Sequence, residues 1–84
     1  MSNSSPPAPY TKKQGQYLAY IHVYTKLHRR PPAEADMRAY FGVTPPSVHS
    51  MVLQLEQRGL IRRRAGAPRS IELVLPPEQL PVLR

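Results

Sequence analysis

The chain contains no cysteine, and only 5 acidic residues stand against 12 lysines and arginines. The absence of cysteine excludes disulfide bridges and thiolate metal sites, and it suits a reducing compartment. No apolar run approaches the roughly 20 residues that a membrane-spanning helix needs. The amino terminus also lacks the apolar stretch of a secretory signal peptide. We therefore expect a cytoplasmic protein with no membrane partner.

What the sequence does contain fits one small, basic domain. The 84 residues carry a formal net charge of +7 and allow a single core. Prolines and serines fill the first residues, and prolines return near the end. We predict a flexible leader over residues 1–10, a folded domain over 11–75 and a proline-rich tail over 76–84.

The first predicted helix begins at a Thr-x-x-Gln pattern over residues 11–14, which is the signature of a capping box. It ends before Pro31, because the residue ahead of a proline avoids helical backbone. At helical spacing, Tyr17, Ile21 and Tyr24 share one apolar stripe.

The apolar arc of this helix is wider than one core-facing stripe needs. Its outer part consists of Tyr20, Val23 and Leu27. These side chains complete the core, form a self-association surface, or receive the apolar residues of the tail, which are Leu80, Val82 and Leu83. We expect burial in the core.

A second helix is predicted from Pro32 or the next residue to Phe41, with Gly42 as its stop. Met37, Tyr40 and Phe41 would form its inner face. Only Val43 and Thr44 separate Gly42 from the predicted start of the next helix.

The third helix is predicted to begin after the N-cap Thr44 and to stop at Gly59. Its core side carries Val48, Met51, Val52 and Leu55. Two short helices joined through a glycine-containing turn form a helix-turn-helix.

After Gly59 the apolar period changes from helical to about two. A turn over residues 65–69 precedes a returning strand over 70–75, with Ile71, Leu73 and Leu75 facing inward. The predicted fold is therefore mainly α with a small β-hairpin: a winged helix-turn-helix with three helices and a two-stranded wing.

The open side of the third helix presents uncharged hydrogen-bonding groups, namely Ser47, Ser50, Gln54 and Gln57, with His49 at its flank. Such groups suit base edges in a major groove, although serine and glutamine are also common on any wet helix face. Six arginines are the predicted contacts to the DNA backbone or minor groove: Arg29, Arg30, Arg62, Arg63, Arg64 and Arg69. The wing arginines would equally protect a hairpin edge from pairing.

Other functional classes find little support. His22 and His28 lie on different sides of one helix, and no acidic partner stands at ligand spacing, so we expect no metal. We find no catalytic residues, no cofactor site and no small-molecule site. Two alternatives to DNA binding remain: a winged helix that binds an acidic protein partner, and a weaker one, structured RNA.

From Thr11 to Leu73 the residues resemble the amino-terminal DNA-binding domain of LexA-type repressors. The shared marks are Thr-x-x-Gln at 11–14, Pro31-Pro32, Ala35-Asp36-Met37, Phe41-Gly42, Arg58-Gly59-Leu60-Ile61, and Gly66 with Arg69-Ser70-Ile71. The resemblance implies that the third helix enters the major groove.

The resemblance also implies which positions read bases: Thr44, Pro46, Ser47, His49 and Ser50, to which the helix face adds Gln54. Pro46, His49 and Ser50 stand where LexA repressors usually carry an asparagine and two glutamates, so the docking mode should carry over and the operator should not. Ala33 replaces a hydroxyl N-cap, at a cost of about 1 kcal/mol to the second helix.

LexA repressors continue into a Ser/Lys self-cleaving domain that also dimerises them. The present chain stops at Arg84, so we expect neither the protease nor that dimer interface. A single winged helix buries only about 600–1,000 Å² on DNA. A homodimer on half-sites about 34 Å apart would supply the missing contact area.

Overall fold

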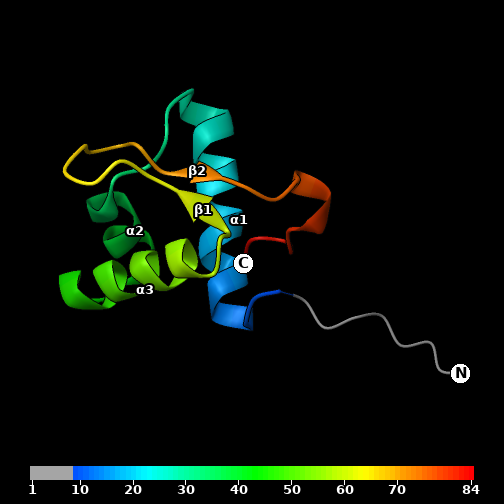
Figure 1. Ribbon diagram of the computed structural model, residues 1–84, viewed down its shortest axis with the longest axis horizontal. Helices are drawn as coiled ribbons and strands as arrows, with labels where there is room; N and C mark the ends of the chain where they lie inside the picture. Colours follow the sequence, from blue (N-terminus) through cyan, green and yellow to red (C-terminus); the bar gives the residue numbers. More distant parts are fainter. Residues whose placement is uncertain (1–8) are drawn as a thin grey trace, which may run out of the picture.

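The computed structural model describes residues 9–84, so residues 1–8 of the leader predicted over 1–10 lie outside the described residues. The elements are α1 (Lys12–His28), α2 (Glu34–Phe41), α3 (Pro45–Gln57), β1 (Ile61–Arg62), β2 (Glu72–Leu73) and the 3-10 turn η1 (Pro77–Gln79). The two strands pair antiparallel in one sheet. Three helices followed by a hairpin confirm the predicted winged helix-turn-helix (Figure 1).

The helix termini follow the chemistry of their caps. The Thr11 hydroxyl accepts a hydrogen bond from the Gln14 N–H at 3.1 Å, and the Gln14 side chain accepts one from the Thr11 N–H at 3.0 Å. Both halves of the predicted capping box are thus present at α1. The third helix begins after Thr44, as predicted, with prolines in its first turn.

The second helix begins at Glu34, after the predicted start. Ala33 is its N-cap and has no side-chain acceptor, so only half of a capping box forms here. The Asp36 carboxylate accepts the Ala33 N–H at 2.8 Å. The helix ends on Gly42 with φ 65°, a left-handed conformation in which glycine carries no side-chain penalty.

The core lies where the three helices meet the hairpin. Its buried members are Tyr17, Leu18, Ile21, Met37, Val48, Met51, Val52, Leu55, Leu60, Ile61 and Ile71. The predicted inner face of α3 is therefore confirmed. The rings of Tyr17 and Phe41 stack with centroids 4.1 Å apart, which joins α1 to α2.

Three predicted core residues are not buried. Tyr40, Val23 and Leu27 are 47%, 36% and 73% exposed. The prediction of full burial for the wide arc of α1 was therefore wrong, and so was that of an inner position for Tyr40. A domain of this size cannot cover the whole circumference of a long helix. The second helix packs on Tyr20, with the Tyr20 and Tyr40 ring centroids 4.7 Å apart, whereas Val23 and Leu27 remain exposed.

The strands are shorter than predicted. The expected strand over 70–75 pairs only at Glu72–Leu73, with one more bond from the Val74 N–H to the Leu60 carbonyl at 3.0 Å. Ile71 is buried, whereas Leu73 and Leu75 are only half-buried. Arg69 adopts a left-handed φ of 55° and Pro76 lacks an N–H, so neither side of the segment can extend the ladder.

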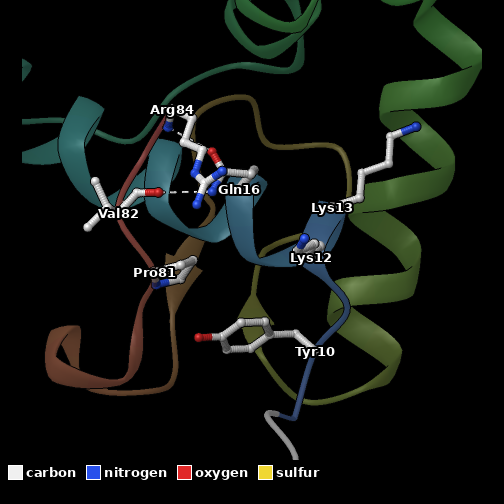
Figure 2. Close-up of a pocket in the computed structure, with 7 residues that line it drawn as sticks. All are labelled: Tyr10, Lys12, Lys13, Gln16, Pro81, Val82 and Arg84. Carbon is white, nitrogen blue, oxygen red and sulfur yellow. Dashed lines mark hydrogen bonds between the residues drawn. The ribbon is translucent and has the colours of Figure 1, made fainter.

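The tail, residues 76–84, returns to the amino-terminal half of α1 (Figures 1 and 2). The Gln16 side chain donates to the Val82 carbonyl at 2.9 Å and accepts the Arg84 N–H at 2.8 Å. Tyr10, predicted to lie in the leader, donates its hydroxyl to the Gln79 carbonyl. Of the apolar tail residues, Leu80 packs against the core, whereas Val82 is 81% exposed. Val23 and Leu27 of α1 are themselves exposed, so the tail does not cover them.

Gly15 allows this return. A Cβ placed on it would lie 2.8 Å from the Tyr10 ring and 3.1 Å from Pro81. Alanine normally stabilises a helix interior over glycine by about 1 kcal/mol. Here we expect Gly15→Ala to destabilise the protein by about 1 kcal/mol, because Tyr10 must move away from the tail.

The measurement is the free energy of unfolding in urea. The matched control is the same substitution in a Tyr10→Ala background, where most of the clash is gone and Gly15→Ala should stabilise. A stabilising Gly15→Ala in the unchanged background would contradict the close packing of Tyr10 on α1.

Candidate nucleic-acid interface

The outer face of α3 is open. All six residues predicted to read bases are exposed: Thr44, Pro46, Ser47, His49, Ser50 and Gln54. Ser47, Ser50 and Gln54 lie on the side of the helix away from Val48, Val52 and Leu55, whose side chains are fully buried, while His49 lies at the flank and Thr44 at the N-cap. The core therefore fixes the helix orientation and presents these polar groups to solvent.

Hydrogen bonds along this face hold its side chains in place. The hydroxyl oxygens of Thr44 and Ser47 lie 2.9 Å apart at the helix start. One turn later, Gln54 donates to the Ser50 hydroxyl at 3.5 Å and accepts from Gln14 of α1 at 3.3 Å. The chain of contacts positions Gln54 and limits the freedom of its amide.

His49 is tied to the preceding helix. Its Nδ1 lies 3.3 Å from a carboxylate oxygen of Glu34, at the start of α2. Both side chains are partly exposed, so the pair adds little stability. It does fix the direction in which the imidazole leaves α3.

A groove of about 500 Å³ separates the first turn of α1 from α3. Lys13 lines it together with Ser47, Ser50 and Gln54. Lys13 was not among the residues predicted from the sequence to contact DNA, although it lies in the first turn of the predicted helix, two positions after the capping residue Thr11. Its ammonium is suited to a phosphate beside a duplex bound on α3.

The wing arginines differ in their partners. Arg62 pairs across the hairpin with Glu72 at 3.2 Å, and both side chains are well exposed. Arg63 pairs with Glu56 at 3.1 Å and is only 18% exposed, so it joins the wing to the last turn of α3. Arg64 is exposed and forms no salt bridge with any residue of the range 9–84. Of the arginines in this run, it offers the least engaged guanidinium.

Arg69 is directed into the protein. One guanidinium nitrogen lies 3.0 Å from the Asp36 carboxylate, 3.1 Å from the Tyr24 hydroxyl and 3.3 Å from the Pro31 carbonyl. The wing is thereby attached to α1, to α2 and to the connector between them. We interpret Arg69 as a positioning residue for the wing.

The carboxylate of Asp36 is stabilised in its charged form. The hydrogen bond from the Ala33 N–H and the guanidinium of Arg69 lower the pKa of Asp36 below its ordinary value. A carboxyl group with a lowered pKa stabilises the folded state above its unfolded pKa of about 3.9, and that contribution is lost as the pH falls through the folded pKa.

We therefore expect Asp36→Asn to reduce the acid sensitivity of the protein. Thermal melting followed by circular dichroism from about pH 6 to pH 2 should show a smaller drop in Tm for the variant. Glu78→Gln in the exposed 3-10 turn is the matched control and should leave the acid limb unchanged. Equal acid limbs for Asp36→Asn and the parent would contradict the role of this carboxylate.

The structure does not bring all six predicted backbone contacts together. Figure 1 shows that the amino end of α3 and the loop between β1 and β2 project in the same direction, away from α1. Arg29 and Arg30 instead follow the carboxyl end of α1, where they line a groove beside β2. The wing arginines and those of this connector thus line two neighbouring hollows, which meet at Pro31 and Glu72.

Two further features bear on chemistry. Among residues 9–84, no helix combines the length and apolar character that crossing a bilayer requires. In the same part of the chain, no three His, Asp or Glu side chains gather closely enough to hold a metal ion.

The sequence profile of one protein family, the LexA DNA binding domain, matches residues 8–70. A LexA repressor of Ruegeria sp. (strain TM1040) is 37% identical over 71 residues, covering 83% of this chain and 30% of the repressor. A LexA repressor of Exiguobacterium sibiricum is 39% identical over 66 residues, covering 77% of this chain and 32% of the repressor. One of Thermosipho africanus is 35% identical over 72 residues, covering 86% and 36%.

The chain spans about a third of the length of these curated relatives. The family match lies on the three helices and reaches the end of the wing loop. It includes the whole outer face of α3 described above.

Proposed function

The chain belongs to the LexA DNA-binding domain family, and from this membership we propose that it is a sequence-specific regulator of transcription that binds double-stranded DNA. The observation that carries the proposal is the open polar face of α3, which the core holds outward. Lys13 borders it on one side, and Arg64 extends from the wing. Uncharged donors and acceptors at the centre with cations around them match the division between base reading and phosphate contact.

We propose that α3 lies in the major groove. Ser47, Ser50 and Gln54 would contact base edges, because their groups are exposed and partly held in place by neighbours. Thr44 and Pro46 would lie against the groove wall at the helix start. His49, restrained by Glu34, would contact the outermost base pair of the site.

The wing would contact the DNA backbone or enter the minor groove through the exposed guanidinium of Arg64. Arg64 is the proposed phosphate contact, and Arg62 joins it when its exposed pair with Glu72 opens. Arg63 and Arg69 support this loop from behind through Glu56 and Asp36. Because the similar proteins are LexA repressors of bacteria, we propose that this protein acts on DNA in a bacterial cytoplasm.

We also propose that two copies bind one operator. A single module of this size buries about 600–1,000 Å² on DNA, which rarely gives tight specific binding. Two half-sites about 10 base pairs apart from centre to centre would place two α3 helices on one side of the duplex.

Selection of bound sequences from a random duplex pool tests the proposed function. The expected result is one enriched sequence with an inverted repeat. Recovery of no enriched sequence, with equal affinity for every duplex at low salt, would contradict sequence-specific binding. An enriched sequence without a repeat would contradict the two-copy arrangement alone.

Arg64→Ala should weaken binding to all duplexes and reduce the slope of log K against log salt by about 1, because one phosphate contact is lost. Fluorescence anisotropy at several salt concentrations gives this slope. The control is Arg30→Ala, which removes the same charge from the connector after α1 and should leave the salt slope unchanged. An unchanged slope for Arg64→Ala would contradict the assignment of the wing.

A further inference from the structure

A second groove lies away from α3, between the carboxy-terminal half of α1 and β2. Its volume is about 560 Å³. Ile21 and Leu73 contribute its apolar floor, and the connector closes one end at Pro31. Three cations, Lys26, Arg29 and Arg30, stand on its rim.

The groove follows the free edge of the sheet. Among residues 9–84 only two strands are present, and no strand of this part of the chain lies beside the outer edge of β2. The Val74 N–H bonds to the Leu60 carbonyl, and Arg62 lies opposite Glu72. In an antiparallel ladder, hydrogen-bonded pairs alternate with non-hydrogen-bonded pairs. The pair Ile61–Leu73 lies between the bonded pair Leu60–Val74 and the pair Arg62–Glu72, so it is a non-bonded pair. The N–H and carbonyl of Leu73 therefore point away from β1. Within residues 9–84 neither group has a hydrogen-bond partner.

The protein's own connector cannot fill this edge. The segment after Arg30 is Pro31-Pro32, and neither proline has an N–H to donate to a neighbouring strand. The connector accordingly contains no strand in the structure. The outer edge of β2 beside the groove is therefore not occupied by the connector.

The rim carries positive charge that the protein does not neutralise. Lys26, Arg29 and Arg30 form no salt bridge with any residue of the described part of the chain. Glu72 lies at the groove but is paired with Arg62. Arg29 caps the carboxyl end of α1 with a left-handed φ of 61°, a conformation that favours glycine. Its side chain lines the groove.

We propose that this groove binds an extended acidic segment of a partner protein, which adds to β2 as a third strand. Its backbone would pair with Leu73, an apolar side chain would lie against the half-buried Leu73 side chain, and its carboxylates would face the three rim cations. Strand addition of this kind obtains affinity from main-chain hydrogen bonds and specificity from alternate side chains.

Other occupants fit less well. A second copy would bring the same cations face to face, in a chain with a net charge of +7. A phosphate backbone gains nothing from an apolar floor and has no strand to pair with Leu73. The groove is also at the opposite end of α1 from the amino-terminal turn that borders α3, so DNA and the acidic segment can bind together.

The test uses a labelled, end-blocked peptide of about ten residues with alternating glutamate and valine, and a second peptide with proline at its central position. Anisotropy should give a dissociation constant about tenfold weaker for the proline peptide, which lacks a donor for the edge. In 15N-HSQC spectra the first peptide should shift the amides of Leu73 and of residues 25–30. Equal binding of both peptides, or shifts centred on residues 44–54, would overturn the proposal.

Charge variants complete the experiment. Lys26→Gln/Arg30→Gln should weaken the peptide at least about tenfold, since two ion pairs in a partly enclosed groove are lost. Lys12→Gln/Arg38→Gln, which removes two exposed cations elsewhere, should bind as the parent does. A selected DNA duplex should leave peptide binding intact, and displacement of the peptide by DNA would show that the two share one surface and would refute a separate site.

Discussion

Replacing Ser47 and Ser50 together by glutamate is expected to eliminate sequence-specific DNA binding. Both side chains are exposed on α3, so the change should leave the core and the helix intact. Two carboxylates would meet the negative duplex where hydroxyl groups now face base edges. Specific and nonspecific binding usually differ by at least about a thousandfold, and we expect the variant to fall to the nonspecific level.

The measurement is anisotropy with the selected duplex and with a random duplex of the same length. The matched control is Thr25→Glu/Gln79→Glu, which adds the same two charges at exposed positions away from α3. The control should lose affinity equally for both duplexes and keep its preference. Loss of preference in the control, or its retention in the α3 variant, would contradict base reading by this face.

Replacing Arg69 by alanine is expected to weaken DNA binding about tenfold for every sequence without changing the salt slope. The guanidinium attaches the wing to Asp36, Tyr24 and the Pro31 carbonyl. When these bonds are lost, the wing loop moves more freely and Arg64 is less well placed. A phosphate contact would instead reduce the slope, so the slope distinguishes a positioning role from direct contact.

A double-mutant cycle with Asp36 provides the control. If Arg69 acts through Asp36, the loss of affinity from Arg69→Ala should largely disappear in an Asp36→Ala background. Thermal melting should show the same coupling. Additive effects of the two substitutions, together with a reduced salt slope for Arg69→Ala, would assign Arg69 to the DNA backbone instead.

Local signals in the sequence predicted the helices well. The capping box at Thr11, the N-cap at Thr44 and the stop at Gly42 are all present as expected. Each acts over a few residues, so the chemistry of the segment alone sets the boundary. The buried face of α3 follows from the same short-range logic, since its apolar residues repeat at the helical period.

Contacts between distant residues could not be read from the sequence. Arg69 belongs to a run of cations, and nothing near it indicates that folding places it against Asp36, 33 positions earlier. Leu27 is exposed and the tail binds to Gln16 because this small domain has few elements that can cover α1. Neither feature has a local signal in the sequence. The distribution of the arginines between two neighbouring hollows is likewise a property of the tertiary structure.

The most direct test of DNA binding through α3 is an HSQC titration of the whole chain with the duplex recovered by selection. We predict the largest amide shifts in residues 44–54 and at Arg64, with smaller ones at Lys13. The amide resonances of Leu73 and of residues 25–30 should not shift. Large shifts at Leu73 and residues 25–30, with the amides of α3 unmoved, would contradict the account.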